Sequence, residues 1–360
     1  MGELPAARMA RAGLAVALAA IAVLGAGCGS GGGEAVEGPV TVYVSLPLTG
    51  PEGSAGGDAA DGARLALEDA GGRAGELEVR ARYLDDARGR GWDPVAVGEN
   101  ARAAVQDSSA AAYIGELASE PTRASAPITN QAGIAQISPG ASAIDLTGPA
   151  EGYPDTPGRY RPSGEATFAR VVPSDGEQVG ALAEWAGEKG VGRLAGRSDG
   201  SPFGNLMLSE FTADAGEVGV QVAGGRERGV GTGTSFVAGG GPFGPGVLTV
   251  SSARGAASGA VVAGELPDAA FARGFRARFG REPGPYAAYG YEAMRVALEA
   301  IGKADRQGGF RASIVAGILG SEHPDSILGG YSITEEGDST LCAVQRYLLE
   351  PLRPERAVCP

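Results

Sequence analysis

The chain alternates short apolar runs that suit β-strands with longer amphipathic runs that suit α-helices, and this order constrains its fold more than any other feature. Residues 77–83, LEVRARY, alternate apolar and charged side chains with the period of two typical of a strand with one exposed face, which fits an edge strand. In residues 58–72, apolar side chains recur at helical spacing until Gly71 and Gly72 end the helix. Strands that alternate with helices predict an α/β fold with parallel strands joined by crossover helices.

The first half of the chain contains strands and helices in strict alternation. Asp93 and Pro94 begin one of the helices, because Asp is a frequent N-cap residue and Pro is tolerated at the first helical position. The expected strands lie within residues 40–50, 77–83, 111–116 and 134–140, and the expected helices lie within residues 58–72, 92–107 and 120–133.

The same order begins again after a Pro- and Gly-rich stretch at residues 148–164, which predicts a second α/β lobe. Residues 229–246 are predicted as a plain loop, because they are rich in glycine and contain neither a GxxxxGK[ST] nor a GxGxxG motif between a strand and a helix. The second half is expected to have strands within residues 167–174, 193–198, 220–225, 327–334 and 342–350, and helices within residues 175–190, 205–216, 269–280, 286–305 and 310–321.

Charge and histidine content exclude several kinds of chemistry. The chain has 30 Lys and Arg against 43 Asp and Glu, a net charge of −13, so it is poorly suited to bind nucleic acid or an anionic membrane surface. Its only histidine, His323, precedes Pro324 in a segment predicted as a surface turn, which leaves a hydrolase without a base. We therefore expect no metal, no cofactor and no enzymatic activity, although a mechanism that uses carboxylates alone remains formally open.

The N-terminus has the layout of a secretory signal peptide. Arg8 and Arg11 precede an uncharged apolar stretch at residues 12–27, which is shorter than the ~20 residues of a membrane-spanning helix. The small residues before Cys28 resemble a bacterial lipobox, in which the cysteine is lipidated and becomes the new N-terminus. The alternative is an ordinary signal peptide with an incidental cysteine. Residues 29–33 are almost all glycine and are expected to form a flexible tether.

Two further cysteines, Cys342 and Cys359, lie near the C-terminus. In an exported protein, two remaining cysteines most simply form a disulfide with each other. The alternative is two free thiols.

Two α/β lobes on an exported, acidic chain with few candidate catalytic residues indicate a binding protein whose ligand lies between the lobes. About 330 residues remain without the signal peptide, more than the ~250–300 at which a single core stops growing. Ligands of open parallel sheets bind beyond the carboxyl ends of the strands, where this chain has loops rich in hydroxyl groups, glycine and helix-start amides that suit a small anion or carboxylate. The alternative is that the Ser and Thr residues of these loops merely cap helices, and for Ser119 and Ser142 both roles can hold at once. These loops are residues 45–53, 115–122, 138–142 and 196–204.

Three stretches of the first half, residues 45–72, 83–107 and 112–142, resemble the leucine/isoleucine/valine-binding proteins. These are type I periplasmic solute-binding proteins, including bacterial lipoproteins, that deliver ligand to ABC importers. The resemblance is specific over residues 40–147 and returns at residues 280–301. It implies a two-lobed Venus-flytrap fold in which each lobe is a parallel sheet flanked by helices and the chain crosses between the lobes three times.

We therefore expect the following division of the chain. The signal peptide covers residues 1–27, and the lipidated cysteine and tether cover residues 28–39. The first lobe combines residues 40–168 and 286–328, the second lobe combines residues 169–285 and 329–350, and residues 351–360 form a C-terminal tail.

The resemblance also implies a ligand site. In the family, a serine after the YIG strand and small or hydroxyl residues after ISP hold the ligand carboxylate, and an aromatic residue of the second lobe closes over the ligand. The family's second-lobe carboxylate, which pairs with the ligand ammonium group, has no counterpart in residues 247–255, and its first-lobe aromatic residue falls at Ala55. Glu120 would repel an anionic group but attract an ammonium group. The candidate ligand-binding residues are Ser119, Glu120, Gly140, Ala141, Ser142 and Phe203.

The resulting hypothesis is an extracytoplasmic solute-binding lipoprotein, held at the cell membrane by its lipid anchor. It is expected to act as a monomer and to deliver an amino acid, by default a branched-chain one, or a similar small polar molecule to the permease of an ABC importer. Two alternatives keep the fold without a transport role: a sensory receptor and a copy that has lost ligand binding. An exported enzyme would need a nucleophile–base pair or metal cluster that the sequence does not show.

Overall fold

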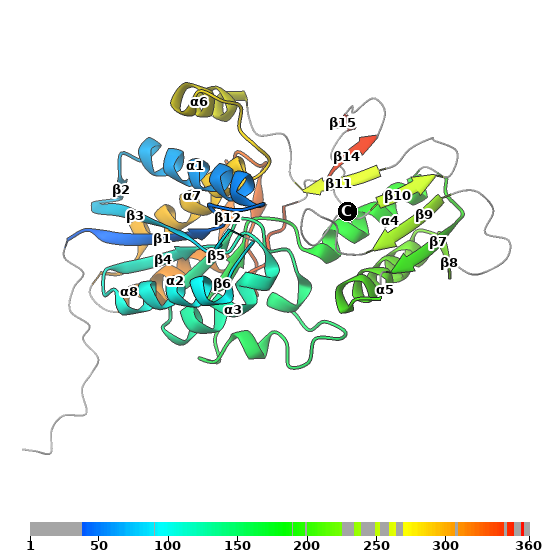
Figure 1. Ribbon diagram of the computed structural model, residues 1–360, viewed down its shortest axis with the longest axis horizontal. Coiled ribbons are helices and arrows are strands. Elements are labelled where there is room, and N and C mark those ends of the chain that lie inside the picture. The colour runs from blue at the N-terminus through cyan, green and yellow to red at the C-terminus, as the bar shows by residue number, and fades with distance from the viewer. Residues whose placement is uncertain are drawn as a thin grey trace, which may run out of the picture.

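The described part of the chain forms two large β-sheets, each flanked by helices, that lie side by side in the molecule (Figure 1). This arrangement confirms the predicted α/β class and its two lobes. Within the part of the chain described below, no helix is both long and apolar enough to cross a membrane. The computed structural model describes residues 38–89, 91–188, 190–198, 200–224, 234–238, 249–252, 259–263, 269–306, 309–341, 344–348 and 354–355.

The first sheet has six strands in the order β2-β3-β1-β4-β5-β6, and all neighbouring pairs except β2 with β3 are parallel. The predicted edge strand is β3, which alternates buried and exposed residues along its first half and has only the two-residue β2 outside it. The elements of this half are β1 (Val40–Leu46), α1 (Gly53–Asp69), β2 (Arg73–Ala74), β3 (Leu77–Asp85), α2 (Pro94–Gln106), β4 (Ala110–Ile114), α3 (Ser119–Gln131), β5 (Ala135–Ser138) and β6 (Phe168–Arg170), with short 3-10 turns at Ile144–Leu146 and Gly158–Tyr160.

Two predicted helix boundaries in the first lobe, the start of α2 and the end of α1, are confirmed, whereas α1 begins at Gly53, before the predicted residue 58. The Asp93 carboxylate accepts hydrogen bonds from the backbone N–H groups of Val95 at 3.0 Å and Ala96 at 2.8 Å, so Asp93 is the N-cap of α2. After α1, Gly71 and Gly72 have φ angles of 64° and 68°, a left-handed conformation that favours glycine and ends the helix.

The second sheet has seven strands in the order β15-β14-β11-β10-β9-β7-β8. It is parallel only where β7 pairs with β8 and β9, and it is antiparallel from β9 to β15, whereas we predicted a parallel sheet. The connections at residues 239–248 and 253–258 are shorter than the roughly dozen residues that a parallel crossover needs. The elements of this lobe are α4 (Asp175–Glu188), β7 (Arg193–Ser198), α5 (Pro202–Glu217), β8 (Gln221–Gly224), β9 (Thr234–Ala238), β10 (Thr249–Ser252), β11 (Gly259–Ala263), β14 (Val344–Leu348) and β15 (Pro354–Glu355).

The five described elements between β11 and β14 return to the first lobe. They include α6, whose Phe271 and Phe275 lie in the first core together with residues of α1. The chain thus passes between the sheets after β6, after β11 and before β14, and the predicted three crossings are confirmed. These elements are α6 (Ala269–Phe279), α7 (Ala287–Lys303), α8 (Phe310–Ile318) and the hairpin of β12 (Glu322–His323) and β13 (Tyr331–Ser332).

The predicted lobe boundaries and one predicted loop need correction. We placed residues 169–285 and 329–350 in the second lobe, but β6 extends the first sheet to Arg170 and α6 packs on the first core. β9 also lies within residues 229–246, which we predicted as a loop. Three aromatic or aliphatic residues of the last predicted segment, Tyr331, Ile333 and Leu341, likewise lie in the first core.

Helices α1 and α7 approach closely because each helix has a glycine where it contacts the backbone of the other. A Cβ atom on Gly62 of α1 would lie 1.8 Å from the Ala287 carbonyl oxygen, and one on Gly290 of α7 would lie 2.0 Å from the Ala59 carbonyl oxygen. Any larger residue at these two positions would push the helices apart. The pair is central to the first core, because α7 buries one face against α1 and the sheet.

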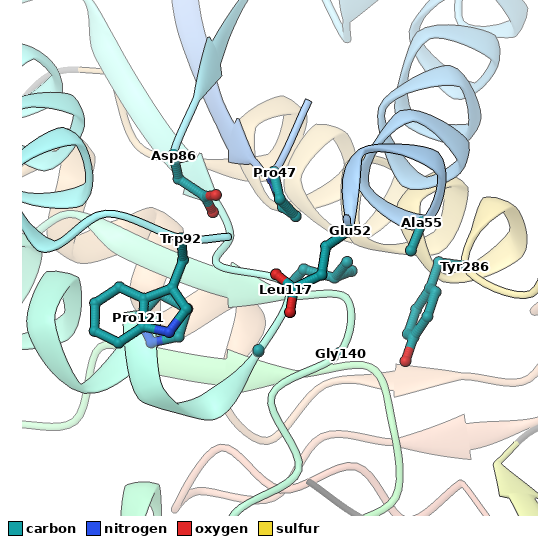
Figure 2. Close-up of a pocket in the computed structure, with 10 residues that line it drawn as sticks. Pro47, Glu52, Ala55, Asp86, Trp92, Leu117, Pro121, Gly140 and Tyr286 are labelled. Atoms are coloured by element: carbon teal, nitrogen blue, oxygen red, sulfur yellow. The ribbon is translucent and has the colours of Figure 1, made fainter. Parts of the chain in front are cut away.

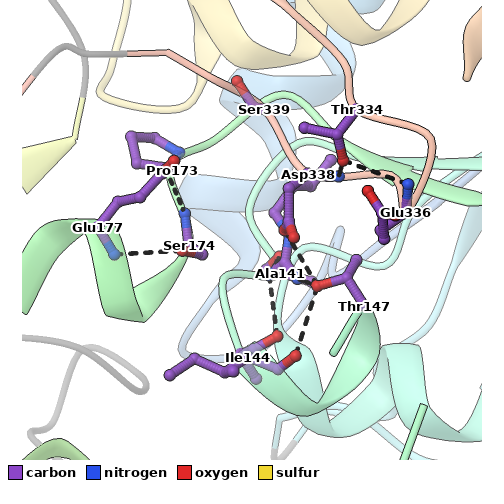
Figure 3. A network of polar contacts seen from close by, with 12 residues as sticks. Ala141, Ile144, Thr147, Pro173, Ser174, Glu177, Thr334, Glu336, Asp338 and Ser339 are labelled. Carbon is purple, nitrogen blue, oxygen red and sulfur yellow. Dashed lines mark hydrogen bonds and ion pairs between the residues drawn. The ribbon is translucent and has the colours of Figure 1, made fainter. Parts of the chain in front are cut away.

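A polar network lies where the chain leaves the first lobe, at the first and the third crossing (Figure 3). Arg170, at the end of β6, is fully buried, with its Nε 2.9 Å from the Asp338 carboxylate. Its guanidinium also donates to the carbonyl groups of Ala141 at 3.0 Å and Ala143 at 2.9 Å. The Thr147 hydroxyl donates to Asp338 at 3.0 Å. The network joins the loop after β5 to the segment before the third crossing.

Helix α4 begins immediately after the first crossing with a capping box (Figure 3). The Ser174 hydroxyl accepts from the Glu177 backbone N–H, and the Glu177 carboxylate accepts from the Ser174 backbone N–H, both at 3.2 Å. Burial raises the pKa of Glu177 to about 7.

Candidate ligand-binding site

A pocket opens at the carboxyl edge of the first sheet, where the loops after β1, β3, β4 and β5 meet (Figure 2). This is the edge at which ligands of parallel sheets bind. The pocket encloses about 60 Å³, well below the ~300–1,000 Å³ of a complete ligand site, so the first lobe supplies only part of one. The lining residues are Pro47, Glu52, Ala55, Asp86, Trp92, Leu117, Ala118, Pro121, Gly140 and Tyr286.

The same edge adjoins the second lobe. The backbone N–H of Asp175, the first residue of α4, donates to the Ser142 carbonyl in the loop after β5 at 2.7 Å. Burial raises the pKa of the Asp175 carboxyl group to about 6, against the opposing effects of the Ser142 hydroxyl and the Arg170 charge. The loop after β5 therefore lines the pocket through Gly140 and contacts the second lobe through Ser142.

Aromatic side chains form two walls of the pocket. Figure 2 shows the Trp92 and Tyr286 rings on opposite sides of it. Trp92 is 36% exposed, which is unusual for a large apolar side chain. Ala55 also lines the pocket, at the position where the resemblance places an aromatic residue. Trp92 and Tyr286, which the sequence analysis did not identify, supply the aromatic surface instead.

Two buried carboxyl groups lie at the inner end of the pocket. Asp86 lines it, and Glu116 faces Asp86 and accepts a hydrogen bond from the Tyr113 hydroxyl at 2.6 Å. Burial, together with the charges of Asp85 and Glu52, raises the pKa of Asp86 to about 6. Burial and the Asp86 charge raise the pKa of Glu116 well above its ordinary value. At neutral pH we therefore expect the two carboxyl groups to share one proton and to carry one negative charge.

The preceding residue, Asp85, holds the pocket loops in place. Its carboxylate accepts from the Leu48 backbone N–H at 2.8 Å, the Thr49 hydroxyl at 2.6 Å and the Ala87 backbone N–H at 3.0 Å. Burial alone would raise the Asp85 pKa, but these hydrogen bonds lower it overall. Consecutive acidic residues thus have different environments, because Asp85 bonds to the loop after β1 whereas Asp86 lines the pocket.

Four of the predicted ligand residues lie around this edge. Ser119 is the first residue of α3, and its hydroxyl accepts from the Ala143 backbone N–H at 3.1 Å. Gly140 lines the pocket, and a Cβ atom there would lie 2.3 Å from the Leu117 carbonyl oxygen. Ala141 and Ser142 are buried beside it. The hydroxyl of Ser119 therefore fixes the loop whose Gly140 forms the pocket wall.

The other two predicted residues lie elsewhere. Glu120 is exposed and pairs with Arg123 at 3.3 Å. Phe203 packs against the core of the second lobe. Neither belongs to the lining of the pocket.

His323 is buried rather than in a surface turn. Its Nε2 lies 2.8 Å from the Ser321 hydroxyl, which donates its own proton to the Ile318 carbonyl at 2.6 Å. His323 therefore donates to the serine oxygen instead of acting as its base. Within the described residues, no cluster of three or more His, Cys, Asp or Glu residues is suited to hold a metal ion. The predictions for Cys28, Cys342 and Cys359 lie outside the described residues.

Family membership follows from the sequence. The profile of the periplasmic binding protein family matches residues 39–238, more than half of the chain. The chain therefore belongs to this family, whose members are solute-binding proteins. No curated protein sequence matches the chain.

Several solved structures of substrate-binding proteins have a similar fold. A leucine-binding protein from Thermotoga maritima is 20% identical with a TM-score of 0.66, covering 89% of this chain and 99% of its own. A substrate-binding protein from Desulfitobacterium hafniense in complex with Leu is 19% identical with a TM-score of 0.65, covering 88% and 99%. A solute-binding protein from Rhodopseudomonas palustris in complex with 3,4-dihydroxybenzoic acid is 18% identical with a TM-score of 0.66, covering 90% and 97%. The fold is shared, and the ligands of these proteins differ.

Proposed function

We propose that this chain is the extracytoplasmic solute-binding component of an ABC importer and binds a small molecule, by default a branched-chain amino acid, between its two lobes. The observation that carries the proposal is the pocket at the carboxyl edge of the first sheet, next to the loop that contacts α4. An incomplete pocket on one lobe suits a protein whose second lobe closes over the ligand.

The N-terminus of α3 supports the binding of a carboxylate. Ala118 and Pro121 line the pocket, so the first turn of this helix borders it. Free backbone N–H groups at a helix N-terminus attract anions. We propose that this turn, with Ser119, Gly140 and Ser142, holds the carboxylate of an amino acid or a related solute.

Cys28 is proposed as the lipid anchor that holds the protein at the outer face of the cell membrane, where it would meet the permease. The support is the sequence around it: two arginines, an apolar stretch and small residues before the cysteine. The lipid would replace a membrane-spanning helix.

A solute panel tests the proposed function. Thermal unfolding of the purified protein is measured with the twenty amino acids, small peptides, polyamines, amides, carboxylates and sugars. A ligand at 100 times its dissociation constant adds about 2.7 kcal/mol of stability, enough for a clear shift. A shift with an aliphatic amino acid supports the default ligand, and a shift with another solute keeps the function and replaces the ligand. No shift with any solute would contradict the proposal.

A further inference from the structure

We propose that the pocket binds a positively charged group of the ligand, an ammonium or substituted ammonium group, with Asp86 and Glu52 of the first lobe as its partners. This inference rests on the proposed function, because it names the chemical class of the solute and the end that the first lobe holds. An amino acid meets the requirement, and so does an amine without a carboxylate. An organic acid without an amino group does not.

Asp86 is the strongest observation. It is fully buried, it lines the pocket, and within the described residues its carboxylate has no hydrogen-bond partner other than the carboxyl group of Glu116. An ionised carboxylate is costly to bury unless it is paired or hydrogen-bonded. A cationic ligand group would supply both the missing donors and the missing countercharge.

Glu116 relieves this cost only in part, because its hydrogen bond lowers the pKa of Asp86 while burial and the charges of Asp85 and Glu52 raise that pKa overall. One of its oxygens accepts from Tyr113, and the other has no partner in the described part of the chain. Because Glu116 and Asp86 are both carboxyl groups, they can hydrogen-bond to each other only through a shared proton. Sharing one proton leaves the pair with one negative charge next to the pocket.

The surrounding charges are also negative. Among the described residues, no Lys, Arg or His lines the pocket, and the other charges that act on Asp86 belong to Asp85 and Glu52. Figure 2 shows the carboxyl groups of Asp86 and Glu52 directed toward the middle of the pocket. Two carboxylates around an otherwise apolar space favour a cation over an anion.

The aromatic walls suit the same ligand group. The faces of Trp and Tyr rings attract ammonium and substituted ammonium groups, most strongly when water is excluded. Trp92 and Tyr286 lie on opposite sides of the pocket (Figure 2). Carboxylates and aromatic rings thus converge on one small space, a combination that suits a cationic group better than an anion.

This arrangement differs from the one that the resemblance implies. There, the carboxylate that pairs with the ligand ammonium group comes from the second lobe, and residues 247–255 of this chain offer none. Glu120, the alternative considered from the sequence, is exposed and paired with Arg123. Asp86 would therefore perform this role from the first lobe.

Three probes that share the same branched side chain distinguish binding through the ammonium group from binding through the carboxylate. Leucine carries both an ammonium group and a carboxylate, 3-methylbutylamine carries only the ammonium group, and 4-methylpentanoate carries only the carboxylate. Isothermal titration calorimetry of the purified protein at pH 8 is expected to detect binding of leucine and the amine but not of the acid. Binding of the acid with no binding of the amine would overturn the inference.

Two variants test the role of Asp86. Asp86→Asn is expected to weaken binding of 3-methylbutylamine at least tenfold while the protein stays folded. Glu78→Gln is the matched control, because Glu78 is an exposed acidic residue near the start of β3, whereas Asp86 follows the end of that strand. It should leave the affinity unchanged. If only leucine binds, the same two variants are titrated with leucine. Equal affinities of Asp86→Asn and the wild type would overturn the inference.

The solute panel separates this inference from the proposed function. If none of the solutes that stabilise the protein contains a positively charged group, the inference is wrong and the proposed function stands. If no solute of any class binds, the proposed function fails and the inference falls with it. The expected result is that every stabilising solute carries a positive charge.

Discussion

Ionisation of the Asp86 carboxyl group lowers the stability of the folded protein in the absence of a ligand. Because its pKa in the folded state is raised to about 6, the cost is absent below the ordinary pKa of Asp, near 4, and is complete above about pH 6. We expect Asp86→Asn to increase the free energy of unfolding of the unliganded protein by about 1–3 kcal/mol at pH 8. At pH 4 the gain should vanish. Urea denaturation at both pH values measures it.

The control for this prediction is again Glu78→Gln, which should change stability by no more than about 0.5 kcal/mol at either pH. A loss of stability for Asp86→Asn at pH 8, or an equal change at both pH values, would show that the carboxylate is satisfied in the folded protein. The same substitution is expected to stabilise the unliganded protein and to weaken binding. That pairing is characteristic of a binding residue kept at a cost in stability.

Ser119 fixes the loop after β5, so loss of its hydroxyl should affect both stability and binding. We expect Ser119→Ala to weaken the affinity for the solute found in the panel by about 1–3 kcal/mol, because the Ala143 N–H loses its buried acceptor and the loop shifts. Ser142→Ala should act in the same direction. Calorimetric titration of each variant measures the loss. Unchanged affinity in both variants would refute the assignment of these serines to the site.

Some residues of the site can be predicted from the sequence and others cannot. Gly140 and the neighbourhood of Ser119 follow from strand ends and helix starts, which are local features. Trp92 and Tyr286 come from distant loops and meet only when the lobe folds, so nothing in their local sequence marks them. The different environments of Asp85 and Asp86 likewise depend on the loop after β1, which only the folded protein brings to them.

At the scale of elements, the contact of α1 with α7 depends on glycine. We expect Gly62→Ala to destabilise the protein by about 1–3 kcal/mol or more, because its Cβ would collide with the Ala287 carbonyl oxygen. Gly57→Ala in the same helix is the control, because no atom lies within 4 Å of the added Cβ. It should stabilise the protein by about 0.5–1 kcal/mol through higher helix propensity. Thermal or urea denaturation compares them, and equal effects would contradict the packing account.

Most elements of the first lobe could be predicted because their signals are local and mutually consistent. Asp93 begins α2, Gly71 and Gly72 end α1, and the alternation in β3 reports its half-exposed face. The second lobe is less predictable. Glycine-rich sequence conceals β9, and strand direction in the second sheet depends on connection lengths rather than on side-chain patterns. Helix α6 follows a second-lobe strand, but its phenylalanines pack in the first core. The hydrophobic periodicity of a helix does not show which lobe the helix packs on.

For the whole molecule, the N-terminal sequence predicts where the protein is retained. We expect Cys28→Ser to release the protein from the membrane fraction, because the lipid attached to that cysteine would be its anchor. Fractionation followed by immunoblotting compares the variant with the wild type. Cys342→Ser is a suitable control, because that residue lies far from the lipobox-like segment and should leave membrane retention unchanged. Persistence of the Cys28→Ser protein in the membrane fraction would contradict the anchor.

The two lobes are joined by three crossings. Within the first lobe, the network of Arg170 with Asp338 connects the loop beside the pocket to the segment before the third crossing. Movement of one lobe against the other would bring the second lobe over the pocket. The most direct test of this account is small-angle X-ray scattering without ligand and with the solute found in the panel at saturation. The account predicts a smaller radius of gyration with the solute. An unchanged radius of gyration with the solute bound would contradict binding between closing lobes.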